Sequence, residues 1–232
     1  TLSGYAISDF VLVNQGTPSL RDRDEGPPPE ALIGMAGARS ADGLAAGFTT
    51  SGIKDGTVSD TAGNTGTGTG ALSRNSAGQN NTGTGYLALN TNTTGTGNTA
   101  SGYGALYQNS EGNYNTATGY GTLFVNTTGD YAVATGYAAL YNNTTGAGNS
   151  ASGYGALYTN ITGSRNTATG SVALFMNTEG DQNTATGYEA LRENTTGFYN
   201  TASGFRALRE NTEGYYNTAS GYQALMANAT GI

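Results

Sequence analysis

The chain has 232 residues and a formal net charge of −7, with 38 Gly and no Cys, His or Trp. Without Cys or His, it lacks thiolate and imidazole nucleophiles and the commonest ligands for zinc and copper. Its nine basic residues can neutralise few phosphates, so we expect no nucleic-acid partner. No apolar run approaches the roughly 18 to 20 residues of a membrane span, so we expect no membrane insertion.

Residues 1–63 precede the regular part of the chain and form the first predicted domain. Ser8–Asn14 is a short apolar run with β-branched residues, which predicts a strand. The consecutive prolines within Arg21–Glu30 favour an extended linker. Ala31–Thr61 is expected to hold irregular coils that lead into the repeats. Residues 1–63 are the candidate end cap, which a solenoid needs because an open coil exposes unpaired backbone. The chain begins at Thr1 without a signal peptide, which fits a processed, exported protein and equally a trimmed one.

Residues 64–232 form the second predicted domain, which is built from a unit of 17 residues. Ten copies begin at positions 64, 81, 98, 115, 132, 149, 166, 183, 200 and 217. Two neighbouring copies have the sequences NTATGYEALRENTTGFY and NTASGFRALRENTEGYY. Every copy has Gly at unit position 5, Leu at position 9, Asn at position 12 and Gly at position 15. Self-similarity at a fixed short period indicates a solenoid or a fibrous array.

Each unit combines a predicted strand with a predicted turn. The final N-T-T-G favours a turn, and the initial T-A-T-G-Y-x-A alternates as a strand does. A helix over unit positions 5 to 12 is the alternative, but Gly119–Asn126 (GYGTLFVN) places Gly and β-branched residues there. We therefore predict an all-β fold, a parallel β-solenoid (β-roll) of ten 17-residue coils with an irregular N-terminal segment. Coils spaced by about 4.8 Å would form a rod on the order of 48 Å long.

Stacking in register would align equal unit positions into columns along this rod. The Leu at position 9 predicts a core ladder, with members Leu106, Leu123, Leu140, Leu157, Leu174, Leu191, Leu208 and Leu225. The Asn at position 12 predicts a ladder of side-chain amides, a feature that supports stacked chains. Its members are Asn109, Asn126, Asn143, Asn160, Asn177, Asn194, Asn211 and Asn228.

Unit position 7 suggests how the Thr residues are oriented. It ranges from Gly to charged residues such as Glu189 and Arg206, so we expect it to face water. Strand alternation would then turn positions 2, 4, 6 and 8 inward or toward a partner chain. An ice-binding surface made of Thr-x-Thr ranks is a further hypothesis, which this orientation disfavours. The ranks are Thr65/Thr67, Thr82/Thr84, Thr116/Thr118, Thr167/Thr169 and Thr184/Thr186.

The block N-T-A-[TS]-G-[YF]-x-A-L recurs along the second domain, as in Asn183–Leu191 and Asn217–Leu225. It resembles the head repeats of trimeric autotransporter adhesins and the shaft repeats of some phage tail fibres. The resemblance covers Asn64–Ile232. It implies a left-handed parallel β-roll, usually trimeric, on a cell or virion surface.

The favoured function is structural: a subunit of an extracellular or cell-surface fibre that assembles with itself head to tail. The last unit ends at Gly231-Ile232 without a capping segment, and an uncapped coil can template the edge of another subunit. Strand donation by the N-terminal segment would form the joint. The candidate joint residues are Phe10, Val11, Leu12 and Val13. We expect no enzyme activity, metal or cofactor, because the sequence has no Ser-His-Asp set, metal-ligand cluster or recurring carboxylate pair.

The alternative function is that of a trimeric adhesin or tail-fibre shaft that binds a surface receptor or glycan. Exposed rings such as Tyr107 and Tyr158 could stack on sugars, although rings of this kind more often pack between coils or chains. N-x-[ST] sequons, mostly in the predicted turns, indicate that the chain could itself be glycosylated. The candidate positions are Asn80, Asn92, Asn126, Asn142, Asn143, Asn160, Asn194 and Asn228.

Overall fold

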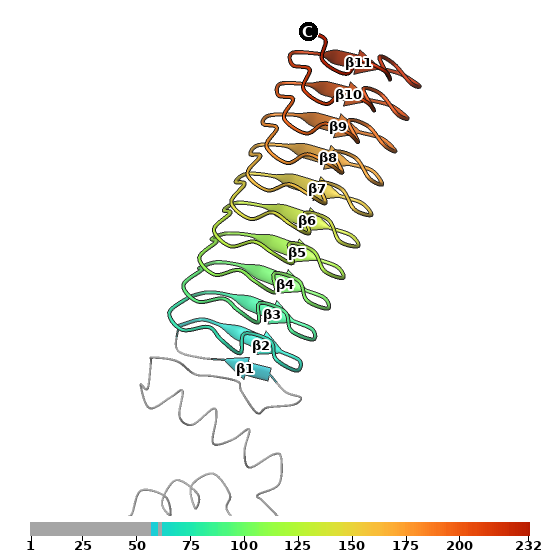
Figure 1. The fold of residues 1–232 in the computed structure, drawn as a ribbon. Helices are drawn as coiled ribbons and strands as arrows, with labels where there is room; N and C mark the ends of the chain where they lie inside the picture. Colours follow the sequence, from blue (N-terminus) through green and yellow to red (C-terminus); the bar gives the residue numbers. More distant parts are fainter. Residues whose placement is uncertain (1–56, 60–61) are drawn as a thin grey trace, which may run out of the picture.

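The computed structural model describes residues 57–59 and 62–232. The repeats form a rod of stacked coils, each of which contributes one short strand (Figure 1). The strands belong to one 11-stranded sheet, in which their spatial order equals their order in the sequence. They are β1 (Thr57–Ser59), β2 (Thr65–Thr67), β3 (Thr82–Thr84), β4 (Thr99–Ser101), β5 (Thr116–Thr118), β6 (Val133–Thr135), β7 (Ser150–Ser152), β8 (Thr167–Thr169), β9 (Thr184–Thr186), β10 (Thr201–Ser203) and β11 (Thr218–Ser220).

The strands from β2 to β11 are parallel and pair in the register of the repeat. Ala168 in β8, for example, pairs with Ala185 in β9, one unit later. The prediction of an all-β parallel solenoid with 17-residue coils is confirmed, and no helix occurs within residues 57–59 and 62–232. β1 runs antiparallel to β2, with Thr57 opposite Thr67. The first edge of the sheet is therefore covered by a reversed strand.

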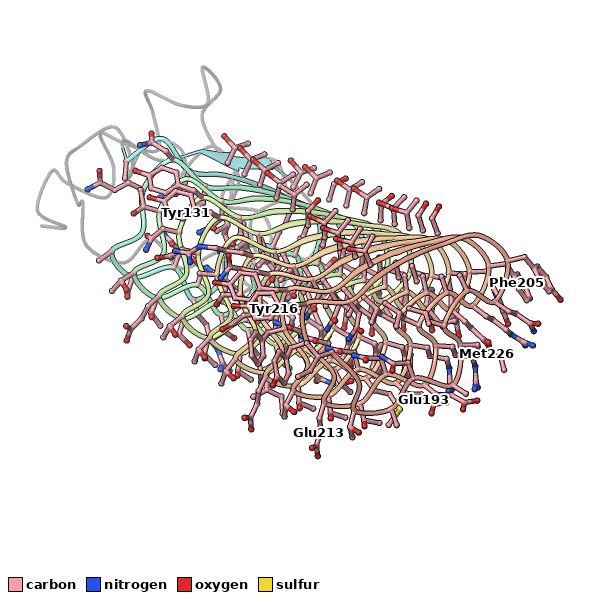
Figure 2. All side chains as sticks on the ribbon, turned by 90° about the horizontal axis from the view of Figure 1, so that it is seen from above. Tyr131, Glu193, Phe205, Glu213, Tyr216 and Met226 are labelled. Carbon is pink, nitrogen blue, oxygen red and sulfur yellow. The ribbon has the colours of Figure 1, made fainter. Side chains whose placement is uncertain are left out.

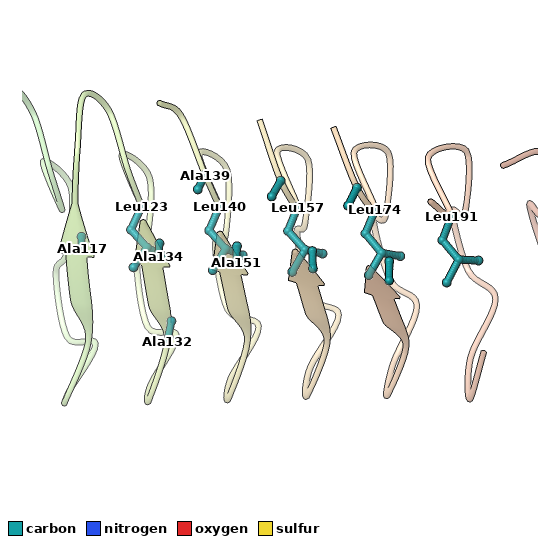
Figure 3. Close-up of a cluster of buried hydrophobic side chains, with 14 of the residues drawn as sticks. Ala117, Leu123, Ala132, Ala134, Ala139, Leu140, Ala151, Leu157, Leu174 and Leu191 are labelled. Carbon is teal, nitrogen blue, oxygen red and sulfur yellow. The ribbon is translucent and has the colours of Figure 1, made fainter. Parts of the chain in front are cut away.

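The apolar part of the rod's interior is a Leu column packed between Ala columns (Figure 3). The Leu at unit position 9 is fully buried in every copy from Leu89 to Leu208. Backbone hydrogen bonds join the coils beside this column, as from the Leu157 N–H to the Ala173 C=O at 3.0 Å. With one Leu and two Ala per coil, a single coil has little to bury by itself. The core is therefore completed by stacking.

Residues in the left-handed backbone region turn the chain at the corners of each coil. Leu at position 9 is one of them, with φ of 53° at Leu157, and Glu189 at position 7 has φ of 54°. This conformation costs roughly 1 to 2 kcal/mol for a residue other than Gly. At unit position 5 only Gly fits, because a Cβ on Gly153 (φ 136°) would lie 2.5 Å from the Gly170 carbonyl oxygen of the next coil.

The predicted inward orientation of the Thr residues is wrong. In β3 to β11, unit positions 2 and 4 are exposed and position 3 is buried. Each strand ends at position 4, and the turn at unit positions 5 to 7 breaks the alternation on which the prediction depended. Position 7 is also not uniformly exposed, since Glu189 is buried. The strand hydroxyls therefore face water.

Candidate functional site: side-chain columns along the rod

The Asn column at unit position 12 forms a continuous hydrogen-bonded ladder inside the rod. From Asn92 to Asn211, each amide donates to the side-chain oxygen of the preceding coil, as from Asn160 to Asn143 at 2.7 Å. It also donates to the Gly carbonyl three residues later, as from Asn160 to Gly163 at 2.7 Å. The column is fully buried from Asn92 to Asn211. Within the described residues no buried side-chain nitrogen or oxygen lacks a partner, so the ladder is fully paired.

A second Asn column, at unit position 1, was missed by the prediction. The side-chain oxygen of Asn183 accepts the Asn200 backbone N–H at 3.0 Å. The Asn183 amide donates to the Gly197 carbonyl at 2.7 Å, and that carbonyl also accepts from Asn194 at 2.9 Å. The two ladders therefore meet at the Gly of position 15. The available signal was Asn at position 1 in nine of the ten copies, with Ala132 as the exception.

Aromatic side chains form stacked columns on the surface. Position 6 stacks ring on ring from Tyr86 to Tyr154, with centroids 4.7 to 5.2 Å apart. Position 10 does the same from Tyr107 to Phe175, at 4.8 to 5.1 Å. Because neighbouring rings cover both faces of each inner ring, only its edge meets solvent. The inner rings therefore offer no open face on which a sugar could stack.

Glu189, Arg206 and Arg209 form a partly buried ion-pair cluster that links two coils. The Nε atoms of Arg206 and Arg209 lie 2.7 Å and 3.0 Å from the same oxygen of Glu189. Burial acts to raise the pKa of Glu189, but the hydrogen bonds from the two Arg side chains outweigh it and hold that pKa below its usual value. The carboxylate is thus kept ionised by structural partners.

The sequons divide into buried and accessible positions. The expectation that they lie in exposed turns is wrong for the five fully buried members of the position-12 ladder, Asn92, Asn126, Asn143, Asn160 and Asn194. Each of these amides is hydrogen-bonded inside the stack, so a glycan would break the ladder and find no space. The sequons with at least partial exposure are Asn80, Asn142 and Asn228.

Hydroxyl side chains cover the outer side of the sheet, and we call this surface the Thr face. Its members are the outward residues of β3 to β11: Thr82, Thr84, Thr99, Ser101, Thr116, Thr118, Val133, Thr135, Ser150, Ser152, Thr167, Thr169, Thr184, Thr186, Thr201, Ser203, Thr218 and Ser220. All are exposed, and all but Val133 carry a hydroxyl. Figure 2 shows how side chains recur as ranks along the rod.

The hydroxyls of the Thr face take no part in holding the coils together. Within Thr82–Ser220, which the structure describes throughout, none of them forms a hydrogen bond inside the protein. Thr at unit position 13 behaves differently, since its hydroxyl bonds to the next coil, as from Thr144 to the Ile161 carbonyl at 2.8 Å. The Thr face is therefore available to solvent or to a ligand.

The last described coil presents core residues at an open face. Leu225, a predicted member of the core ladder, is 52% exposed, whereas Leu208 in the preceding coil is fully buried. The amide of Asn228 bonds to Asn211 at 3.3 Å and has no coil beyond it in the described chain. The predicted joint residues lie outside the described residues: Phe10, Val11, Leu12 and Val13.

The described residues show no metal cluster, and the comparisons with known proteins show no relative. Residues 62–232 contain no group of three or more His, Cys, Asp or Glu that could hold a metal ion. The same part of the chain has no helix with the length and apolar character that crossing a membrane requires. No protein-family model matches the sequence, and comparison with curated proteins and with solved structures finds no match. The surfaces are therefore interpreted from their own chemistry.

Proposed function

We propose that the chain is a structural subunit of an extracellular or cell-surface fibre in which rods join end to end as a homopolymer. The observation that carries this proposal is the coil-to-coil interface. The same strand pairing, Asn bonding and Leu packing recur from coil to coil, interrupted in one ladder at Ala132. An interface that joins unlike faces by translation does not close on itself, and it generates filaments.

The last described coil shows what the addition of a further coil would cover. β11 lies at the edge of the sheet, and Leu225 beside it is half exposed. A coil from another subunit would give β11 the parallel partner that β10 has. It would also cover Leu225 as Leu208 is covered, which removes apolar area from water.

We favour a single chain as the subunit, rather than an intertwined trimer. One chain alone buries the Leu column from Leu89 to Leu208 and pairs its buried amides. No second chain is needed to complete a coil. The resemblance to adhesin and tail-fibre repeats supports a surface location. The alternative of an adhesin or shaft that binds a receptor or glycan has less support, because the inner rings of the aromatic columns have covered faces.

We assign the other half of the joint to the strand that the sequence predicts at Ser8–Asn14, centred on Phe10–Val13. This assignment rests on the sequence, in which an apolar run is followed by a proline-rich linker long enough to separate it from the rod. Strand addition to an exposed sheet edge is a common mode of association. β1 provides a precedent within the chain, since this segment from before the repeats pairs with the edge of the sheet.

Electron microscopy of the purified chain tests the proposal. We expect long fibres of constant width with an axial repeat close to the length of one subunit. Deletion of Thr1–Gly16 should abolish polymerisation while circular dichroism shows that the coils remain folded. Fibres of the same width from the truncated chain would refute strand donation. Discrete rods with threefold end views would instead identify a trimeric shaft.

A further inference from the structure

We propose that the Thr face binds an ordered layer of water and that its ligand is the surface of an ice crystal. The face lies along the side of the rod, whereas the fibre joint lies at its ends. The two proposals are therefore independent. The inference rests on the chemistry of the outward side chains, on their spacing and on their freedom from internal bonds.

The chemistry of the Thr face is uniform. Its residues present hydroxyls, most of them beside a methyl group, and none is charged or aromatic. The hydroxyls of the Thr face form no hydrogen bond inside the protein, so they keep their full donor and acceptor capacity for water. The hydroxyls that bond to the next coil belong to other Thr residues, such as Thr144. The methyl groups between the hydroxyls neither donate nor accept hydrogen bonds, so water can bond only at the hydroxyls. Water is therefore held at the hydroxyl positions.

The spacing of these groups is fixed in two directions by the backbone. Strands repeat about every 4.8 Å along the rod, and outward residues two apart on a strand are separated by about 6.6 Å. Thr is β-branched, and its restricted χ1 limits the positions of its hydroxyl. The result is a two-dimensional grid, and oxygen atoms in ice repeat at distances of similar size.

The grid stays regular because neighbouring coils are related mainly by translation. In the position-6 column, the planes of neighbouring rings differ by 5° between Tyr103 and Tyr120 and by 4° between Tyr120 and Tyr137. They differ by 20° between Tyr86 and Tyr103 and by 16° between Tyr188 and Phe205. Between Tyr137 and Tyr154 the deviation is 8°. Each strand from β3 to β11 pairs with the next in the same parallel register, so the outward residues of successive strands stay aligned, as a crystalline ligand requires.

Other ligands match the Thr face less well. A protein partner is recognised by protruding aromatic or apolar anchors and by complementary charges, and Val133 is the face's sole apolar member. A nucleic acid would require basic side chains. A neutral array that repeats along the rod instead fits a ligand that is itself a lattice of hydrogen-bond donors and acceptors.

The test is the freezing behaviour of solutions of the full chain. The quantity measured is the gap between the melting and growth temperatures of a single ice crystal, together with the crystal's shape. We expect the wild-type chain to open this gap and to produce faceted crystals. Thr118→Lys places a long charged side chain within the face, and we expect it to remove most of the gap.

Matched variants separate the face from the rest of the coil. Thr128→Lys adds the same charge at an exposed Thr of the same coil, outside the face, and should leave the gap unchanged. Val133→Thr supplies the missing hydroxyl and should widen the gap. Circular dichroism and the melting temperature verify that each variant is folded. The Thr118→Lys chain should form the same fibres as the wild type, because Thr118 lies in β5, away from the ends of the rod.

Several outcomes would overturn the inference. A folded wild-type chain that neither opens a gap nor shapes crystals does not bind ice. An equal loss in Thr118→Lys and Thr128→Lys would attribute the effect to added charge rather than to the face. If Thr118→Lys only converted a sedimenting dimer into a monomer, the Thr face would be an interface between two copies.

Discussion

One residue, Ala132, interrupts the position-1 Asn ladder. Its backbone N–H donates to the side-chain oxygen of Asn115 at 2.8 Å, but Ala132 has no amide with which to continue the ladder. In the next coil the equivalent oxygen, that of Asn149, accepts the Asn166 N–H at 2.9 Å. The Gly146 carbonyl accepts one amide bond, from Asn143. The equivalent carbonyl one coil later, that of Gly163, accepts two, from Asn149 and Asn160. The chain thus contains a natural ladder defect.

We predict that Ala132→Asn stabilises the rod. The new amide would donate to Gly146 and accept the Asn149 N–H, and two hydrogen bonds contribute about 1 to 3 kcal/mol. The reverse change, Asn166→Ala, should lower the free energy of unfolding by a similar amount. Urea denaturation of both variants and the wild type gives the comparison. A destabilised Ala132→Asn would show that the site is too tight for the amide.

The Glu189 cluster predicts a loss of stability in acid. Its folded-state pKa lies below the unfolded value of about 4.3, because the Arg hydrogen bonds outweigh the effect of burial. The contribution of this group is therefore fully present above the unfolded pKa and is lost as the pH falls through the folded pKa. Thermal melts from neutral to acid pH should show a smaller acid loss in Glu189→Gln than in the wild type. Glu213→Gln, at an exposed position, is the control and should follow the wild type.

At the scale of the coil, the Leu column is the element whose disruption should cost most. Leu157 is fully buried, and Leu157→Asp would place an unpaired charge in the core, at a cost of several kcal/mol. Leu225→Asp makes the same change at a half-exposed position and should cost much less. Melting temperatures of the two variants measure the difference. Equal effects would mean that burial in the column does not determine stability.

The repeat accounts for what the sequence could predict about each coil. Invariant Leu and Asn residues at a fixed period are aligned when the units stack in register. This pattern predicts a parallel solenoid. The direction of the Thr side chains could not be predicted in the same way. It depends on the turn at unit positions 5 to 7, where residues such as Glu189 take a left-handed backbone conformation that they rarely adopt. The stacked neighbours impose that conformation, so it is a property of the rod rather than of the local sequence.

At the scale of the whole molecule, the rod is quasi-one-dimensional. Each coil contacts mainly its two neighbours. The stability of the rod is therefore the sum of contributions from the single coils and from the interfaces between them. The ends of the rod and its sides consequently carry separate functions. In the proposed fibre the joint lies at the ends of the rod, whereas the Thr face lies along one side. A change on the side should therefore leave joining intact.

The central claim is that rods join end to end with their coils stacked along the fibre. X-ray diffraction from aligned fibres of the purified chain tests it most directly. If the claim is correct, the coil spacing of about 4.8 Å runs along the fibre axis and gives a reflection on the meridian. A reflection at about 4.8 Å on the equator would contradict the claim, because it would mean that the rods lie perpendicular to the fibre axis. A chain that forms no fibres would contradict it as well.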